Sequence, residues 1–356
     1  MTAAVLATTT TTIAVIGLIV ITIGWIVYGI FNVAGGRKEV GSEIELAANR
    51  KPYFDDETLE GPRLERVQLI GVLLLAVIVV ALPLYWVFEP SRQAGAQDGW
   101  DARFASWGSE LFAPTAEGGF NCAGCHGGMA AVGGEAPFTV TDPNTGEVEA
   151  VNWKAPALNT VFYRFSDDEV RFILTYGRPF SPMSPWGLVG GGPMNAQQID
   201  NLIAYLHSIQ IPRENCLEGE DPLTCDSGHL PSEIQADIDA AANKAVEDGE
   251  AATYGEALFN LSLSSGAYSC ARCHTLGWSY DKPTTSGQGA YGWNLTGGST
   301  NNHFATEADM VAFIKSGSEE GKLYGRNGQG TGRMPGFGTI LTDAQIEAIV
   351  EYVRSL

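Results

Sequence analysis

Two long stretches near the N-terminus contain apolar residues at almost every position and no charged residue. The first covers residues 11–33 and the second covers residues 67–88. A helix needs about 20 consecutive apolar residues to cross a bilayer, and both stretches reach that length. A buried helix of a globular protein is the alternative, but two such stretches so close together favour a transmembrane hairpin, which we assign to residues 1–90. A signal peptide explains the first stretch less well, because it lacks a basic leading segment and a small-residue cleavage motif.

Basic residues flank the polar loop between the two stretches. The loop covers residues 34–66, and Arg37, Lys38, Arg63 and Arg66 lie close to its ends. By the positive-inside rule the loop is cytoplasmic, so the N-terminus and the chain after the second stretch are outside. The pattern predicts a multi-pass protein of a bacterial plasma membrane, with two spans and its larger part on the extracytoplasmic side.

After the apolar stretches, one order of sequence segments occurs twice. The first copy contains GSELF at residues 108–112, then CAGCHG, APAL, FSDDEVRFILTYGRP, SPMSPWG and NAQQIDNLIAYLHSI. The second copy contains GEALF at residues 255–259, then CARCH, WNLTG, FATEADMVAFIKSG, GRMPGFG and TDAQIEAIVEYVRSL. Two copies of one unit predict two domains of one kind, which we place at residues 91–211 and 251–356.

Each copy contains the motif C-x-x-C-H. Its members are Cys122, Cys125 and His126 in the first copy and Cys270, Cys273 and His274 in the second. In this motif the two thiols form thioethers to the vinyl groups of haem, and the adjacent histidine is the proximal ligand of the iron. A structural zinc site needs four ligands close together, a thioredoxin-like motif is expected within a βαβ pattern, and simple disulfides are an alternative in an oxidising compartment. Two copies of the motif outside a membrane favour two covalently bound haem c groups, one in each domain.

Each copy resembles a class I cytochrome c domain. In that family a helix ending in G-x-x-L-F leads into C-x-x-C-H, and the C-terminal helix carries an aromatic residue, matched here by Tyr205 and Tyr352. The resemblance covers residues 100–211 and 251–356, and it implies an all-α fold with two tandem haem domains after the membrane hairpin. It also implies that a methionine in a loop before the C-terminal helix is the second axial ligand of each iron.

The methionine loops give one ligand candidate in the second copy and two in the first. Met334 in GRMPGFG is the candidate in the second domain, and Met183 in SPMSPWG has the same loop position beside a proline in the first. Met194 is the alternative to Met183, although its place directly before the C-terminal helix resembles a packing position. Met310 falls in an apolar helical pattern, and Met129 is too close to its motif to reach the opposite face of the haem.

The apolar pocket walls are predicted to contain Phe120, Pro156, Leu158, Phe172 and Leu206 in the first domain, and Trp293, Leu295, Phe313, Phe337 and Val353 in the second. Trp293 stands where the family usually has proline, which leaves the packing on that side of the haem open.

Several polar side chains also lie near the predicted pockets. The histidines outside the motifs are His207, His229 and His303, and we expect them at the surface rather than on an iron. Arg178, Arg333 and Trp186 are candidates for hydrogen bonds to haem propionates, although an arginine near a haem is as often exposed.

Residues 212–250, between the two copies, are acidic and rich in alanine, and they are predicted to form a linker. Cys216 and Cys225 are the only cysteines outside the C-x-x-C-H motifs. On the oxidising side of a membrane they are expected to form a disulfide, with free reactive thiols as the lesser option. A short helix over residues 231–248 is predicted from helix propensity.

The chain after the second apolar stretch is strongly acidic. Of the 21 basic and 41 acidic residues in the whole chain, 6 and 9 precede residue 90, which leaves 15 and 32. Binding to nucleic acid or to an anionic membrane surface requires a basic patch, so neither is expected. An acidic surface steers a basic soluble redox partner toward the protein, and a general adaptation to salt is the other explanation.

Neither copy contains a nucleophile, a base and oxyanion donors in the pattern of an active site. Each predicted iron has two protein ligands, and an iron without an open position cannot bind oxygen or peroxide. A dihaem peroxidase would need a displaceable ligand, which Met183 and Met334 argue against. The pattern therefore predicts an electron-transfer subunit of an oxidoreductase complex rather than a catalytic subunit by itself.

The predicted function is that of a membrane-anchored dihaem cytochrome c in a respiratory chain, as a subunit of a quinol-oxidising bc-type complex or of its supercomplex with a haem-copper oxidase. In haem content the chain resembles the cytochrome cc subunit of actinobacterial bcc complexes, but that subunit is anchored by a C-terminal helix. The dihaem subunit of a haem-copper oxidase and the electron-accepting cytochrome of a periplasmic dehydrogenase are the alternatives. The expected partners are cytochrome b-type or haem-copper oxidase membrane subunits, and the loop at residues 34–66 is predicted to dock one of them.

Overall fold

The computed structural model describes residues 15–31, 61–142, 145–178, 181–225, 227–263, 268–319 and 333–356. The chain divides into two compact units, Met1–Trp100 and Asp101–Leu356. Most of the predicted cytoplasmic loop, residues 34–60, lies outside the described ranges. The second unit contains both copies of the repeat, so the two predicted haem domains belong to one compact body.

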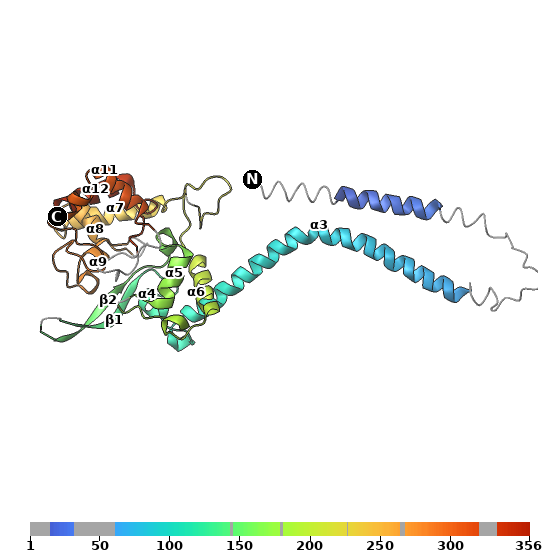
Figure 1. The fold of residues 1–356 in the computed structure, drawn as a ribbon, viewed down its shortest axis with the longest axis horizontal. Helices are drawn as coiled ribbons and strands as arrows, with labels where there is room; N and C mark the ends of the chain where they lie inside the picture. The colour runs from blue at the N-terminus through green and yellow to red at the C-terminus, as the bar shows by residue number, and fades with distance from the viewer. Residues whose placement is uncertain are drawn as a thin grey trace, which may run out of the picture. The chain divides into compact units, whose positions relative to one another are not determined.

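The described part of the first unit is helical. A helix covers Val15–Phe31, and α3 begins at Pro62 and ends at Phe112 in the second unit (Figure 1). The second apolar stretch lies wholly within α3, where its mean hydropathy reaches 2.8 and none of it is buried. Among the described helices, α3 alone is long and apolar enough to cross a membrane, because Val15–Phe31 falls short of the necessary length.

The first copy of the repeat folds around the end of α3 and two further helices. Its elements after α3 are the 3-10 turn Thr115–Glu117, α4 Cys122–His126, β1 Gly134–Thr141, β2 Val148–Ala155, the 3-10 turn Val161–Tyr163, α5 Asp167–Tyr176, the 3-10 turn Leu188–Gly190 and α6 Ala196–Ser208. The strands β1 and β2 pair antiparallel, with Gly134 opposite Ala155 and Thr141 opposite Val148. This hairpin departs from the all-α fold that we predicted, although the chain remains mostly helical.

The second copy repeats the helices of the first without the hairpin. The segment before it contains α7 Ser232–Glu247. The elements of the copy itself are α8 Tyr254–Asn260, α9 Ala271–His274, the 3-10 turn Trp278–Tyr280, α10 Ser299–His303, α11 Glu307–Ser316 and α12 Asp343–Ser355. Here α8, α9, α11 and α12 correspond in order to the end of α3, α4, α5 and α6 (Figure 1).

Corresponding helices begin with the same capping interaction in both copies. Ser166 caps α5 with Glu169, and Thr306 caps α11 with Asp309, each through a reciprocal pair of side-chain and backbone hydrogen bonds. Asn195 and Thr342 begin α6 and α12 in the same way. These capping boxes satisfy backbone N–H groups that no helical turn can reach, so they fix where each helix starts.

The helix before each C-x-x-C-H motif crosses the C-terminal helix of its copy at a glycine. A Cβ atom added to Gly108 would stand 1.9 Å from the carbonyl oxygen of Asn201, and one added to Gly255 would stand 2.0 Å from that of Ala348. Only glycine allows backbones to approach this closely. One helical turn after Gly108, the ring of Phe112 packs against that of Tyr205 across the crossing, with ring centroids 5.2 Å apart.

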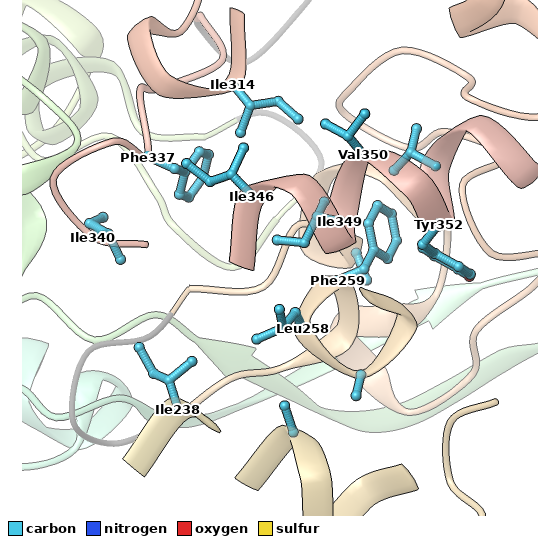
Figure 2. Packing of buried hydrophobic residues seen from close by; sticks show 14 of the residues in the cluster. Ile238, Leu258, Phe259, Ile314, Phe337, Ile340, Ile346, Ile349, Val350 and Tyr352 are labelled. Atoms are coloured by element: carbon cyan, nitrogen blue, oxygen red, sulfur yellow. The ribbon is translucent and has the colours of Figure 1, made fainter. Parts of the chain in front are cut away.

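The equivalent pair in the second copy is Phe259 and Tyr352, with ring centroids 5.4 Å apart. The two rings are tilted by 50° in the first copy and stand closer to edge-on, at 61°, in the second. Figure 2 shows Phe259 and Tyr352 beside the apolar side chains of α12, among them Ile346, Ile349 and Val350. These residues form the core of the second copy, and all of them are buried.

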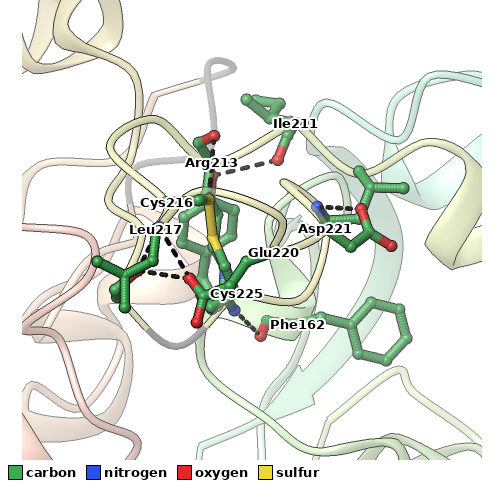
Figure 3. Close-up of a disulfide and its surroundings, with 11 residues drawn as sticks. Phe162, Ile211, Arg213, Cys216, Leu217, Glu220, Asp221 and Cys225 are labelled. Carbon is green, nitrogen blue, oxygen red and sulfur yellow. Dashed lines mark hydrogen bonds between the residues drawn. A yellow bond between two sulfur atoms is a disulfide. The ribbon is translucent and has the colours of Figure 1, made fainter. Parts of the chain in front are cut away.

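The segment between the copies is structured rather than extended. The predicted disulfide joins Cys216 to Cys225, with Cα atoms 5.8 Å apart (Figure 3). Arg213 donates to the carbonyl oxygen of Phe162 at 2.9 Å, which ties the segment to the first copy. The predicted short helix is α7, and its fully buried Ile238 packs into the core of the second copy. The apolar residues of α7 lie on one face of the helix, and they are too few to stand out as an apolar cluster in the sequence.

Candidate functional site

A cavity in the first copy brings together the residues that the sequence singled out there. Cys122, Cys125, His126 and Met183 all line it, and its volume is about 200 Å³. The rest of its wall is mostly apolar and includes Pro156, Leu158 and Leu206, as predicted. Phe120 and Phe172, which we also expected in this wall, do not line it. Phe120 packs against Trp186, and Phe172 is 58% exposed and packs against Tyr176.

The imidazole of His126 is held with one nitrogen free for a metal. Its Nδ1 lies 2.8 Å from the carbonyl oxygen of Pro156. A carbonyl oxygen can only accept a hydrogen bond, so Nδ1 carries the proton and Nε2 keeps its lone pair. Burial lowers the pKa of His126, with the nearby Arg272 acting in the same direction, so the ring is neutral at neutral pH. A neutral imidazole with a free Nε2 is the form that binds haem iron.

The second copy repeats this arrangement. The Nδ1 of His274 donates to the carbonyl oxygen of Trp293, also at 2.8 Å. Burial lowers the pKa of His274 as well. The side chain of Trp293 is 71% exposed, and the residue accepts the hydrogen bond of the histidine through its backbone carbonyl group. The tryptophan side chain is therefore no obstacle to the histidine geometry.

Among the described residues, none of the four motif cysteines forms a disulfide. Burial raises the pKa of Cys122 to about 11 and that of Cys270 to about 12, so both are protonated at neutral pH. Cysteines of thioredoxin-like and zinc sites have lowered pKa values and act as thiolates. In the described part of the chain, no three His, Cys, Asp or Glu side chains are placed to hold a metal ion. The zinc and thioredoxin alternatives are therefore not favoured.

The loops with Met183 and Met334 are anchored in the same way. Each follows a helix that ends in a glycine with positive φ, 70° at Gly177 and 74° at Gly317. A Cβ atom at Gly177 would lie 2.5 Å from the carbonyl oxygen of Met183, and one at Gly317 would lie 2.6 Å from that of Met334. The backbone of each methionine therefore rests directly on the helix end, and glycine is required by both conformation and space.

The other methionines are placed as packing or surface residues. Met194 is fully buried in the first core and does not line the cavity, which favours Met183 over Met194. Met129 is 38% exposed and lies outside the cavity. Met310 is buried in the second core, although it also reaches the wall of the second cavity.

The remaining histidines are at the surface, as expected. The Nε2 of His207 lies 2.8 Å from Asp167, and its ring stacks on Phe162. His229 is exposed in the segment between the copies. His303 is exposed too, but it lies at the wall of the second cavity.

The second cavity, of about 460 Å³, gathers the second set of predicted residues. Cys270, Cys273, His274 and Met334 line it. The five apolar residues that we expected in its wall are all present, and they are Trp293, Leu295, Phe313, Phe337 and Val353.

The two cavities share part of their walls. Phe165 and Arg178 from the first copy, and Tyr268, Cys273 and Tyr291 from the second, line both. A shared wall could not be predicted from the sequence, because it exists only once the two copies are packed together. Cys273 is thus both a member of the second motif and a neighbour of the first cavity.

These side chains fit covalently attached haem. Each cavity offers two cysteine sulfurs, a neutral histidine with a free nitrogen and a thioether sulfur on a separate loop, within a largely apolar wall. The fold and site are therefore those expected of a helical domain that binds haem c through a histidine and a methionine.

Comparison with known proteins supports this for the second copy. Residues 252–356 match the family model described as Cytochrome c. This part of the chain is a cytochrome c domain, which implies covalently bound haem c and haem-based electron transfer. No curated protein and no solved structure gives a significant match.

Proposed function

We propose that the chain is a membrane-anchored dihaem c-type cytochrome that transfers electrons in a respiratory chain. The observation that carries the proposal is the equivalence of the two copies. The first copy has the same glycine crossing, the same histidine-to-carbonyl hydrogen bond and the same glycine-anchored methionine loop as the cytochrome c domain at residues 252–356. A second haem at Cys122, Cys125 and His126 follows from this equivalence.

Both proposed irons have two protein ligands. His126 and Met183 serve the first, and His274 and Met334 serve the second, so neither iron offers a position for oxygen or peroxide. Haem c supplies one-electron redox chemistry when bound, and the chain fixes its orientation and excludes water. Methionine ligation favours the reduced state relative to ligation by two histidines. This arrangement supports electron transfer rather than catalysis at either haem.

The shared wall supports electron exchange between the two sites. Cys273 is a proposed thioether residue of the second haem and also lines the first cavity, together with the aromatic rings of Tyr268 and Tyr291. Electrons that enter at one haem can therefore leave at the other without a soluble carrier.

We further propose that the protein is a subunit of a quinol-oxidising bc-type complex or of its supercomplex with a haem-copper oxidase. The apolar part of α3, which is fully exposed, supports an anchor beside membrane subunits. Two N-terminal spans and haem domains on the extracytoplasmic side belong to the same proposal. The strong excess of acidic residues suits a basic soluble redox partner as a further electron donor or acceptor.

Haem counting tests the dihaem proposal. The purified chain is expected to carry two covalent haems by intact mass and haem absorbance. Cys122→Ala/Cys125→Ala and Cys270→Ala/Cys273→Ala should each carry one, whereas Cys216→Ala/Cys225→Ala should keep two. A parent chain with one haem, unchanged by the first pair of substitutions, would contradict the proposal.

Purification from native membranes in mild detergent tests the complex. We expect membrane subunits with b-type haem or a haem-copper centre to elute with the chain. A chain that elutes alone as a monomer under these conditions would refute its place in a respiratory complex.

A further inference from the structure

Among the residues that the structure describes, the walls of the two cavities carry arginines and no acidic side chain. Arg164, Arg178 and Arg272 line the first cavity, and Arg178 and Arg333 line the second. This is unexpected in a chain with a formal net charge of −20, where acidic residues outnumber basic ones almost two to one. A buried cation requires a compensating charge. Arg333 has one in Glu169, whereas Arg164 and Arg272 of the first cavity form no ion pair with a described carboxylate.

Arg164 is the most deeply buried of these cations, with 3% of its surface exposed. Its two terminal nitrogens donate to Thr160 Oγ1 and to the carbonyl oxygen of Ala157, both at 3.2 Å, and its Nε has no partner. Burial lowers the pKa of Arg164 to about 10, so the guanidinium is still charged at neutral pH. Neutral partners alone do not balance that charge.

Arg272 comes from the second C-x-x-C-H motif, between Cys270 and Cys273. It is 7% exposed, its Nε also has no partner, and one terminal nitrogen donates to the carbonyl oxygen of Lys154 on β2. Neither Arg164 nor Arg272 forms an ion pair with a carboxylate of the described residues. A residue of the second motif thus reaches across to the first copy and lines its cavity.

The two guanidinium groups are close enough to repel each other. They lie 4.5 Å and 5.2 Å from the centre of the same ring, that of Tyr268. The cations are therefore within about 10 Å of each other, in surroundings where charges are weakly screened. Placing them here is favourable only if an anion binds between or beside them.

We propose that Arg164 and Arg272 bind the propionate carboxylates of the haem in the first cavity, and that Arg272 is supplied for this purpose by the second haem-binding motif. The inference rests on the proposed function, since it requires a haem in the first copy. Two carboxylates on one porphyrin edge match two fork-shaped donors whose Nε atoms are unpartnered. Attachment of the second haem and the environment of the first are then linked through one residue.

The test is the substitution Arg272→Gln in the full chain, with Arg171→Gln as the matched control. The substitution Arg171→Gln also removes one positive charge from the protein, but the Arg171 side chain is 42% exposed and is paired with Asp200 on the surface. The midpoint potentials of both haems are measured by optical redox titration. The first haem is identified as the one whose potential changes in Met183→His.

A cation beside a haem favours the reduced iron, so its loss should lower the potential of the first haem. We expect the ratio of oxidised to reduced first haem at a fixed potential to rise about tenfold in Arg272→Gln, equivalent to about 59 mV for one electron. Arg171→Gln should leave both potentials in place. Infrared redox-difference spectra of protein with isotope-labelled propionates should show a shifted carboxylate band in Arg272→Gln only.

Unchanged potential and carboxylate bands in Arg272→Gln, with two haems still attached, would overturn the inference and leave the dihaem proposal standing. A parent chain with one haem would instead overturn the proposed function. If Arg272→Gln does not mature, Arg272→Lys keeps the charge but loses the fork. Its carboxylate band should still shift, and an unshifted band would overturn the inference.

Discussion

The glycine crossings allow a direct test of how each haem domain is held together. In Gly255→Ala the new Cβ would stand 2.0 Å from the carbonyl oxygen of Ala348, about 1.4 Å short of the 3.4 Å at which ordinary van der Waals contact begins. The nearest side-chain atom is the Cβ of Tyr352, at 3.0 Å. The atom in the way is backbone, so the helices α8 and α12 have to move apart.

The size of the effect follows from three contributions. Overpacking of this kind costs about 1–3 kcal/mol. Separation of Phe259 from Tyr352 loses up to about 1 kcal/mol of aromatic contact. Alanine regains about 0.5–1 kcal/mol over glycine in a helix. We therefore expect Gly255→Ala to lower the free energy of unfolding by about 2 kcal/mol.

The assay is guanidinium unfolding of the haem-loaded protein, followed by haem absorbance and by circular dichroism. Gly108→Ala should cause a similar loss, because its Cβ would stand 1.9 Å from the carbonyl oxygen of Asn201. Gly99→Ala is the control, since nothing lies within 4 Å of its Cβ position, and it should give no loss but only the small gain of alanine over glycine in a helix. A loss below about 0.5 kcal/mol in Gly255→Ala would refute the close-crossing argument. A loss in only one of the two copies would refute their equivalence.

Three further predictions concern ligation, the contact between the copies and pH. Met183→Leu and Met334→Leu should each remove the thioether-to-iron absorption of one oxidised haem, whereas Met194→Leu should retain both; a normal spectrum in Met183→Leu would sink that assignment. Glu169→Gln removes the charge partner of Arg333 across the two copies but keeps the cap of α5, and it should cost about 1–2 kcal/mol in urea unfolding. The exposed pair of Arg171 with Asp200 is its control, because Asp200→Asn should cost less than about 1 kcal/mol, and equal costs would contradict the difference in burial. Burial raises the pKa of Tyr163 from 10.0 to about 12, so its contribution to stability is complete below pH 10 and is lost as pH rises toward 12. The free energy of unfolding of Tyr163→Phe should therefore fall less steeply between pH 10 and pH 12 than that of the parent chain, and an equally steep fall would contradict this prediction.

The internal repeat made most of the second unit predictable from the sequence. The repeated spacing located both C-x-x-C-H motifs and the C-terminal helices, because these depend on short-range signals such as glycines and capping residues. The methionine loops were predicted from the resemblance to class I cytochrome c. The comparison at residues 252–356 reaches only the second copy. The first copy is interrupted by the hairpin of β1 and β2, which turns at Asp142. We missed this hairpin because the resemblance implied helices only.

The rest could not be predicted because it arises from packing between distant segments. α7 has few apolar residues, and its Ile238 becomes a core residue only against α8 and α12. Arg272 reads as a charged residue between two cysteines, which favours an exposed position. Its burial depends on the contact with β2, more than a hundred residues earlier in the chain. The role of a buried charge such as Arg272 can be inferred only from the structure in which the two copies are packed together.

The central claim is that two closed haem irons in one chain exchange single electrons. An anaerobic redox titration of the purified full chain, followed by optical spectroscopy, tests it most directly. The account predicts two separate one-electron transitions, with low-spin spectra and thioether-to-iron absorption from both oxidised haems. A single transition, or a high-spin iron that binds added peroxide or cyanide readily, would contradict it.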